Sequence, residues 1–290
     1  GLYTKVAQIV AHEFQIDVAM VKITATTTGK VPNTSATAAS SGTDLNGMAS
    51  MLAARTIKDR IVAFLATEFQ ADKSHVVFAN GQVHIGSETM EFAEAVKRAY
   101  LGRVSLSATG FYATPKLSWD KDQMHGRPFY YFAYGAAVSE VIVDLLTGEN
   151  RLVRADLLHD VGKSLNPAID MGQIEGGFIQ GVGWLTTEEL VWNKDGRLTT
   201  HAPSTYKIPT SADRPVDWRV AFYADGENNE ETIHKPKAVG EPPLMLAIST
   251  WLALSDALAG IDGAAYPGLD APATPERILL CANRLGARFV

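Results

Sequence analysis

The sequence is poor in the residues from which proteins build covalent cross-links and metal centres. Its 290 residues include a single cysteine, Cys281. The chain therefore has no internal disulfide, no cysteine-ligated zinc and no iron–sulfur cluster of its own. The seven histidines are scattered, and none belongs to an HxxxH or HExxH motif, which argues against a metal site made of protein ligands. Such sparing use of cysteine is typical of a reducing compartment, so we expect a cytoplasmic protein.

Basic runs and long apolar runs are also missing. The formal net charge is -6, and the composition gives no support for nucleic-acid binding. The most apolar windows reach only about 15 residues, which is too short to span a bilayer, and the N-terminus has no signal-peptide pattern. The motifs GxxxxGK[ST], GxGxxG and GxSxG do not occur. We expect no nucleic-acid or membrane partner, and any redox chemistry must come from a cofactor.

What the chain does contain is ample material for a core. Hydrophobic residues make up 46% and charged residues 20%, as in ordinary globular proteins. Its length suits one large domain or two interlocked subdomains. Helical and strand patterns are mixed without doubly wound alternation, so we predict an α+β fold with candidate subdomains 1–130 and 131–290. The first residues, GLYTKVAQIVAHEF, lack an initiator methionine, and we expect a fragment, a processed chain or a subunit of a split assembly.

Hydrophobic periodicity predicts the elements. The predicted helices cover residues 1–14, 45–69, 91–101, 171–185, 244–258 and 274–283. The predicted strands cover residues 21–26, 76–80, 82–86, 103–113 and 218–225, and two more lie within 129–162 on either side of a TGEN turn. A further hairpin is expected over 188–200 with Asp195 and Gly196 at its tip. Thr274 is the expected N-cap of the last helix, with Pro275 in its first turn.

The first stretch with candidate chemistry is a tract of small residues, VPNTSATAASSGTDLNG, from Val31 to Gly47. Between Thr34 and Thr43 the side chains are small enough for backbone N–H groups to approach a ligand closely. Asp44 could cap the helix that follows, and exposed amides at a helix N-terminus form an anion site. The plain alternative is a surface loop rich in serine and alanine.

The second stretch is a glycine-rich helix, MGQIEGGFIQGVG, over residues 171–183. Each glycine weakens a helix by roughly 1 kcal/mol relative to alanine, so their retention indicates close packing against another helix or a bulky ligand. Gln173 and Gln180 offer amide groups that could hold the hydrogen-bonding edges of a ligand. Helix packing with solvated glutamines is the competing interpretation.

The third stretch is KAVGEPPL, residues 237–244, in which Glu241 lies between a glycine and two prolines. Pro242 and Pro243 suit the first turn of a helix because they lack the N–H groups that would need partners there. Glu241 would then lie near the N-cap, where the helix dipole favours the ionised carboxylate. A rigidly held carboxylate is what a general base requires. An ordinary capping glutamate is the alternative.

Taken in order, the motifs resemble those of a known family. They are KVPNTSATAASSGTDLNG, RVSLSATGFYATP, AYGAAVSEVIVDLLTGE, DVGKSLNPAIDMGQIEGGFIQGVGWLTTEEL, PSTYKIPT and PKAVGEPPL. Together they resemble the C-terminal half of the molybdenum-binding subunit of bacterial xanthine dehydrogenases, within the xanthine oxidase family of molybdenum hydroxylases. The resemblance covers nearly the whole chain, from GLYTK to DAPATPERI. It implies a molybdopterin-binding domain, C-terminal part, with two intertwined subdomains of mixed sheets and helices.

The resemblance also implies roles for two residues outside the small-residue tract. The glutamate of the family's GEPP motif is its catalytic base, which corresponds to Glu241. It would deprotonate a hydroxyl on Mo(VI), whose oxygen attacks the purine while hydride passes to a sulfido ligand. The glutamine of the glycine-rich motif contacts the pterin, which corresponds to Gln173. The pterin dithiolene would hold the molybdenum, so no protein ligand to the metal is expected.

Within the small-residue tract, the resemblance implies contacts to both cofactor and substrate. Ala38 and Ala39 correspond to the pair beside the molybdenum and the substrate, and Ala39 is also expected against the cofactor. Ser40 and Thr43 would offer hydrogen bonds to the pterin. All four follow from the family motif.

The family pattern extends beyond this chain. A GGTEMGQ-like stretch precedes GLYTK in the family, and the residues that recognise the purine also lie upstream. The implied partners are therefore an N-terminal part of the molybdenum subunit and an iron–sulfur/FAD subunit, in an oligomer. Oxidation of hypoxanthine and xanthine is the implied reaction. One alternative is a related enzyme whose substrate is an aldehyde or another N-heterocycle. The other is a non-catalytic assembly polypeptide. We expect the isolated chain to be inactive.

Overall fold

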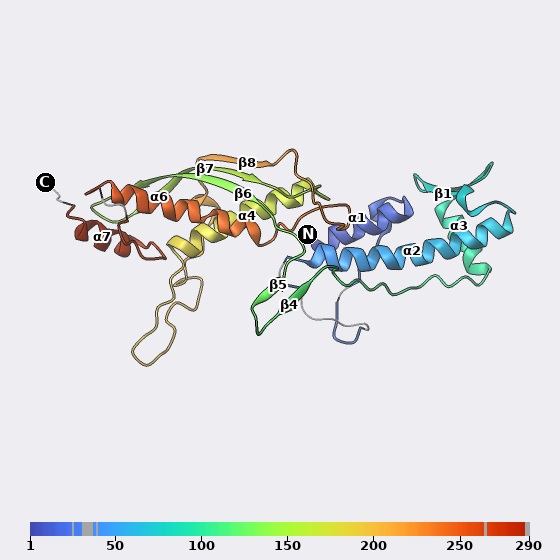
Figure 1. Ribbon diagram of the computed structural model, residues 1–290, viewed down its shortest axis with the longest axis horizontal. Coiled ribbons are helices and arrows are strands. Elements are labelled where there is room, and N and C mark those ends of the chain that lie inside the picture. The colour runs from blue at the N-terminus through green and yellow to red at the C-terminus, as the bar shows by residue number, and fades with distance from the viewer. Residues whose placement is uncertain (25, 31–36, 39, 264–265, 288–290) are drawn as a thin grey trace. The chain divides into compact units, whose positions relative to one another are not determined.

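The computed structural model describes residues 1–290 except 25, 31–36, 39, 264–265 and 288–290 (Figure 1). The chain divides into two units. Unit 1 consists of Gly1–Tyr131 and Asn228–Pro236, and unit 2 consists of Phe132–Glu227 and Lys237–Val290. Both units combine helices with short antiparallel or mixed sheets, in agreement with the predicted α+β class.

In its described residues, unit 1 combines three α-helices with two small antiparallel sheets. Its helical elements are α1 (Leu2–Phe14), η1 (Val18–Met20), α2 (Gly42–Glu68), η2 (Lys73–His75) and α3 (Phe92–Leu101). Its strands are β1 (Val76–Ala79), β2 (Gln82–Ile85), β3 (Glu88–Glu91), β4 (Ser118–Asp120) and β5 (His125–Arg127). Strands β1, β2 and β3 form one antiparallel sheet, and β4 pairs with β5 in a second. The core of this unit lies where the second half of α2 meets the first sheet and α3.

The apolar spacing along α2 explains that core. Ile61 and Leu65 are fully buried on the predicted helix face, and they pack with Val83 of β2 and Ala95 of α3. Residues four apart in a helix lie on the same face, so the spacing read from the sequence selects the buried side. The predicted helices 1–14, 45–69 and 91–101 and the hairpin 76–86 are confirmed.

Unit 2 is a three-stranded sheet with helices on one face (Figure 1). Its strands are β6 (Gly135–Val143), β7 (Asn150–His159) and β8 (Asp217–Phe222). Its helical elements are α4 (Pro167–Thr186), η3 (Ser211–Asp213), α5 (Pro242–Leu246), α6 (Ile248–Ala259) and α7 (Pro275–Arg284). Strand β7 pairs antiparallel with β6 and parallel with β8. The core lies under the sheet, where Leu157 of β7 packs with Ile174 and Phe178 of α4.

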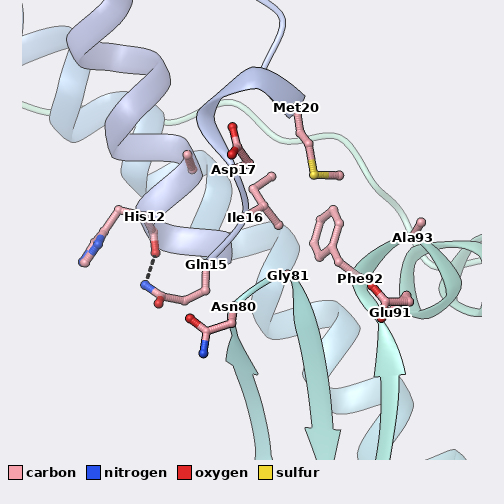
Figure 2. A pocket seen from close by; sticks show the side chains of 11 residues that line it. His12, Gln15, Ile16, Asp17, Met20, Asn80, Gly81, Glu91, Phe92 and Ala93 are labelled. Atoms are coloured by element: carbon pink, nitrogen blue, oxygen red, sulfur yellow. Dashed lines mark hydrogen bonds between the residues drawn. The ribbon is translucent and has the colours of Figure 1, made fainter.

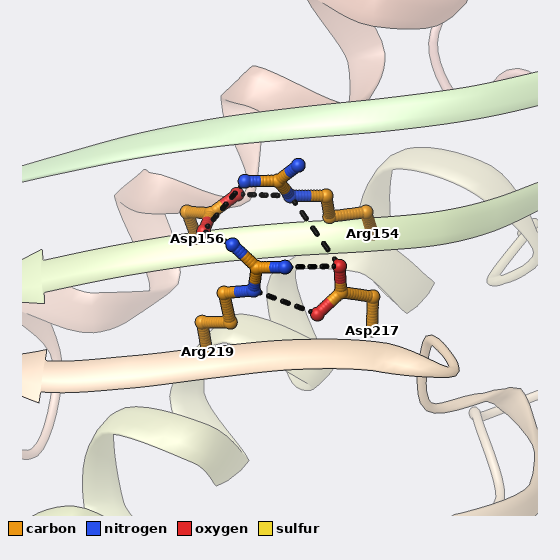
Figure 3. Close-up of polar contacts among 4 residues, drawn as sticks. All are labelled: Arg154, Asp156, Asp217 and Arg219. Carbon is orange, nitrogen blue, oxygen red and sulfur yellow. Dashed lines mark hydrogen bonds and ion pairs between the residues drawn. The ribbon is translucent and has the colours of Figure 1, made fainter.

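Charged side chains from β7 and β8 form a four-residue cluster, made of Arg154, Asp156, Asp217 and Arg219 (Figure 3). The parallel register sets Arg154 opposite Asp217 and Asp156 opposite Arg219. Arg154 Nε donates to Asp156 Oδ2 at 2.6 Å, and this hydrogen bond holds the pKa of Asp156 below its usual range. All four side chains are a third or more exposed, so the cluster favours this register without adding much stability.

Several predicted elements are wrong or shifted. The described residues of 21–26, and residues 103–113, form no strand. Within the described residues these segments pair with no strand, and alternation alone does not ensure a partner. The hairpin expected at 188–200 forms, with Asp195 and Gly196 in its turn, but it is short. The Asn193 N–H donates to the Arg197 carbonyl at 2.9 Å and the Thr199 N–H to the Val191 carbonyl at 2.8 Å, on either side of a bridge between Trp192 and Leu198. The predicted helix 244–258 is divided at Ala247 into α5 and α6.

One helical stretch, Pro242–Ala259, passes a length and hydropathy test for a membrane span, with 18 residues and a mean hydropathy of 1.3. Core helices of soluble proteins pass the same test. Here the stretch packs against α4 and β6 within unit 2, as a core helix does. Its exposed apolar side chains lie along one side, at Met245, Ile248 and Leu252.

Candidate functional site

The glycine-rich helix α4 begins at Pro167, four residues before its predicted start. Asn166 is its N-cap, and the Asn166 side chain accepts a hydrogen bond from the N–H of Ile169 at 3.1 Å. Pro167 fits the first position because its missing N–H needs no partner there. The Asn166-Pro167 pair therefore marks the start of the helix.

Two glycines of α4 provide the contact surface for α5. A Cβ at Gly177 would lie 3.1 Å from Cβ of Pro243, and one at Gly181 would lie 2.5 Å from the carbonyl oxygen of Leu244. The Gly181 position would also be 2.6 Å from Cβ of Ala247. A Cβ at Gly181 would collide with α5, and one at Gly177 would require Pro243 to shift by a few tenths of an ångström. The predicted close helix packing is therefore confirmed at these two positions.

Two other glycines of the same helix have open space beside them. A Cβ built at Gly172 or Gly176 meets nothing within 4 Å. Gln173, between them, is exposed. Packing among the described residues therefore does not explain Gly172 and Gly176, although glycine is costly inside a helix. This segment of α4 offers a smooth surface beside an exposed amide.

Glu241 is the N-cap residue of α5, as expected from its position before the two prolines. Its side chain makes no capping hydrogen bond to the helix, so the capping role considered for it is wrong. The backbone is fixed nonetheless, because the Glu241 carbonyl accepts from the N–H of Leu244 at 3.0 Å and Pro243 is buried against Gly177. The carboxylate belongs to an exposed residue on a well-held backbone.

The helix contacts also relate Glu241 to Gln173. Pro243 lies at Gly177 and Leu244 at Gly181, so α5 advances along α4 in the same direction. The residue before Pro242 therefore lies toward the N-terminal end of α4. Gln173 is one turn before Gly177, on the same helix face. Unit 2 thus brings the predicted base and the predicted pterin ligand to one end of the α4–α5 contact.

The remaining predicted residues belong to unit 1, at the start of α2. Ala38 is exposed, and its carbonyl accepts from the Ser41 hydroxyl at 3.2 Å. Ser40 has a positive φ of 52°, a conformation that helps the chain turn into α2. Thr43 lies half-buried in the first turn of that helix. Ala39 lies outside the described residues.

The predicted cap of α2 is wrong. The N-cap is Ser41, and Asp44 lies inside the first turn. Its carboxylate instead accepts a hydrogen bond from the Tyr131 hydroxyl at 2.5 Å. Burial raises the pKa of Asp44, and the hydrogen bond from Tyr131 opposes this shift. This contact could not be predicted from the sequence because the two residues are 87 positions apart.

A separate pocket of about 580 Å³ in unit 1 contains none of the predicted site residues (Figure 2). It lies at the end of α1 and beside the turn between β1 and β2. The labelled side chains that line it are His12, Gln15, Ile16, Asp17, Met20, Asn80, Glu91, Phe92 and Ala93. Its polar and apolar groups do not converge on one point, and we assign no chemistry to it.

Clusters of three or more His, Cys, Asp or Glu side chains able to hold a metal ion do not occur in the described part of the chain. The predicted site residues near the α4–α5 contact are the amide of Gln173 and the carboxylate of Glu241. Such groups bind the edges of an organic cofactor and move protons; they do not enclose a bare ion. The open surface at Gly172 and Gly176 fits the approach of a flat, bulky group.

The comparisons with known proteins decide the family. The model of the molybdopterin cofactor-binding domain matches residues 1–215. The chain belongs to this family. Solved structures with the same fold include a Cu,Mo-CO dehydrogenase, with a TM-score of 0.80 and 21% identity over 98% of this chain and 34% of that one. Quinoline 2-oxidoreductase from Pseudomonas putida 86 has a TM-score of 0.77 and 25% sequence identity, over 97% of this chain and 35% of that one.

Curated relatives of this molybdopterin cofactor-binding domain include xanthine dehydrogenases. The chain is 43% identical to xanthine dehydrogenase/oxidase of Mus musculus, over 96% of this chain and 20% of that protein. It is 42% identical to xanthine dehydrogenase of Oryza sativa subsp. japonica, over 100% of this chain and 20% of that protein. The predicted family and fold are confirmed, and the chain spans about a fifth of the length of these relatives.

Two charged residues that sequence reasoning did not single out lie close to the α5 segment. Lys237 forms an ion pair with Asp160 in which the two side chains are only 8% and 12% exposed. Both residues are within quoted motifs, KAVGEPPL and DVGKSLNP. Their pairing across 77 positions could not be read from either motif.

Proposed function

We propose that this chain supplies the C-terminal part of the cofactor-binding domain of a molybdenum hydroxylase of the xanthine dehydrogenase type. The identity of 42–43% to xanthine dehydrogenases over nearly the whole chain supports this function. The reaction adds the oxygen of water to a carbon of hypoxanthine or xanthine and releases two protons and two electrons. Bound molybdenum cofactor supplies the redox chemistry of this step.

Glu241 is the residue we assign to proton transfer. It is an exposed residue, its side chain is not used as a helix cap, and its backbone is held by α5. A general base needs a fixed position and access to the proton that it removes. Glu241 would accept a proton as the water-derived oxygen bonds to the substrate carbon, and release it to solvent afterwards.

Gln173 is the residue of unit 2 that we assign to pterin binding. Its amide can donate and accept at the same time, which suits the hydrogen-bonding edge of a pterin. Gly172 and Gly176, which lie one turn apart on the helix face next to Gln173, leave room for that group. In unit 1, we assign pterin hydrogen bonds to Ser40 and Thr43, and contacts with cofactor or substrate to Ala38 and Ala39.

The other parts of the enzyme remain proposals that follow from the relatives. We propose that an N-terminal part of the molybdenum subunit completes the site. We also propose that an iron–sulfur/FAD domain or subunit accepts the electrons, in a cytoplasmic oligomer. We also propose that the 290 residues form two subdomains, 1–130 and 131–290. A substrate other than a purine is the second candidate, because a quinoline oxidoreductase is 25% identical with a TM-score of 0.77.

The test is Glu241→Gln in the assembled, molybdenum-loaded enzyme. Glutamine keeps the size of the side chain and removes its basicity. We expect kcat to fall by at least about 100-fold with xanthine, because a positioned base contributes that much or more. Molybdenum content measured on the same preparation should be unchanged. Turnover within about tenfold of the wild type contradicts the base, and an assembly devoid of molybdenum favours a non-catalytic polypeptide.

A further inference from the structure

The buried ion pair of Lys237 and Asp160 lies at the edge of the unit 2 sheet where β7 and β8 end and β6 begins. Asp160 directly follows β7, and its N–H donates to the carbonyl of Tyr134 at 2.8 Å, just before β6. His159, the last residue of β7, accepts from the N–H of Tyr223 at 2.9 Å, just after β8. Asp160 is therefore held by the sheet itself.

Lys237 is attached to this point by three contacts. Its ammonium group pairs with Asp160 Oδ2. Its backbone N–H donates to the carbonyl of Val161 at 2.8 Å. Its Nζ also lies 5.4 Å from the centroid of the Tyr134 ring, within cation–π range. The other oxygen of Asp160 accepts from the N–H of Gly162 at 2.8 Å, so the carboxylate cannot turn toward another partner without losing a bond.

Glu241 follows Lys237 by four residues. Between them, Val239 is buried in the core under the sheet. After Glu241, Pro243 is buried against Gly177 of α4. The backbone that carries the carboxylate is thus fixed from both sides, at the end of the sheet and on α4. The Glu241 side chain makes no capping bond to α5, and these backbone anchors fix the position of the Cα from which the carboxylate extends.

We propose that the Lys237–Asp160 ion pair is a positioning device that orients Glu241 for proton transfer. The inference rests on the proposed function of Glu241. Removing the ion pair would leave the fold of the sheet in place and loosen the segment before Glu241. A base displaced by about 1 Å loses much of its effect, on the order of 100-fold. A buried pair that only stabilised the fold would not act through Glu241.

The experiment compares four variants of the assembled enzyme. Lys237→Met removes the charge at similar length, and Glu241→Gln tests the base. The double variant, Lys237→Met with Glu241→Gln, measures whether the effect of Lys237 depends on Glu241. Lys163→Met is the matched control, because Lys163 pairs with Glu227 at 3.4 Å in the same unit but is 63% exposed. Molybdenum content, kcat and KM for xanthine, and amide hydrogen exchange of residues 237–246 are measured for each.

We expect Lys237→Met to lower kcat by about 10- to 100-fold while KM changes by less than about threefold. The Leu244 amide, which bonds to Glu241, should exchange at least about tenfold faster than in the wild type. Lys163→Met should change neither quantity. In the Glu241→Gln background, Lys237→Met should cost less than about threefold in kcat, because two residues that act as a unit are not additive.

The proposal is overturned if Lys237→Met behaves like Lys163→Met, or if its effect on kcat is the same with and without Glu241. High activity of Glu241→Gln would instead refute the proposed function, whatever the exchange data show. If Lys237→Met does not fold, the double variant Lys237→Met with Asp160→Asn removes the unpaired charge. That variant should fold, retain molybdenum and show the same loss of kcat, and normal kcat in it also overturns the proposal.

Discussion

Gly176 and Gly181 make a matched pair in α4 because they share a helix and differ only in what lies beside them. A Cβ at Gly176 meets nothing within 4 Å, whereas one at Gly181 lies 2.5 Å from a backbone oxygen and 2.6 Å from Cβ of Ala247. Ordinary contact begins at 3.4 Å. Alanine at Gly176 therefore adds helix propensity without a clash, and alanine at Gly181 forces α5 away from α4.

The two substitutions should change the free energy of unfolding in opposite directions. Gly176→Ala gains up to about 1 kcal/mol, the difference between glycine and alanine in a helix. Gly181→Ala gains the same propensity but loses about 1–3 kcal/mol to overpacking, because the obstacle is backbone and cannot rotate away. We expect the net change at Gly181 to be destabilising. Equilibrium urea denaturation of the two variants and the wild type measures both values.

Cofactor loading gives a second, independent readout for Gly176. If a pterin packs on the open surface, Gly176→Ala should lower the molybdenum content of the assembled enzyme although it stabilises the chain. If Gly176→Ala is no more stable than the wild type, the view that the space beside Gly176 is open is refuted. Stabilisation with normal molybdenum content would refute the assignment of that space to the cofactor, and stabilisation by Gly181→Ala would refute the packing of α5.

Two further predictions concern stability. Burial lowers the pKa of His159, whose Nδ1–H donates to the Tyr134 carbonyl at 2.7 Å. Between the folded and the unfolded pKa of His159, the unfolded chain binds a proton that the folded chain does not. The free energy of unfolding should therefore fall as pH drops through about 6.5 toward the folded pKa. His159→Met should reduce this slope in urea denaturation at a series of pH values, and an unchanged slope contradicts it. Asn166→Ala removes the cap of α4 and should cost about 1 kcal/mol, whereas Asn166→Asp keeps an acceptor and should cost less. Equal costs for the two would contradict the capping contact.

The helices were predictable because their signals are local. Thr274 caps α7 by accepting from the N–H of Arg277 at 3.4 Å, with Pro275 next to it, as its sequence indicates. The long β6–β7 hairpin followed equally from alternation on both sides of a glycine turn. In each case, the residues that decide the structure are neighbours in the chain. The family motifs, read together, also predicted the family correctly.

What failed were predictions that need a partner far away in sequence. Residues 103–113 alternate like a strand, but no strand of the described part of the chain pairs with them. Alternation alone does not show whether a neighbouring strand is present. Strand β8 was predicted, but its parallel pairing with β7 depends on a connection of more than 50 residues. The contact of Asp44 with Tyr131 is of the same kind.

The contrast bears directly on Glu241. A motif reading explains why the backbone is stiff after this residue, since two prolines and a helix follow it. It does not explain what fixes the backbone before it, because the anchor is a carboxylate 77 positions earlier, at the end of β7. A general base needs both, since stiffness on one side alone still allows the carboxylate to swing. The short motif therefore contains only half of the device that holds its own glutamate, and the sheet of unit 2 provides the other half.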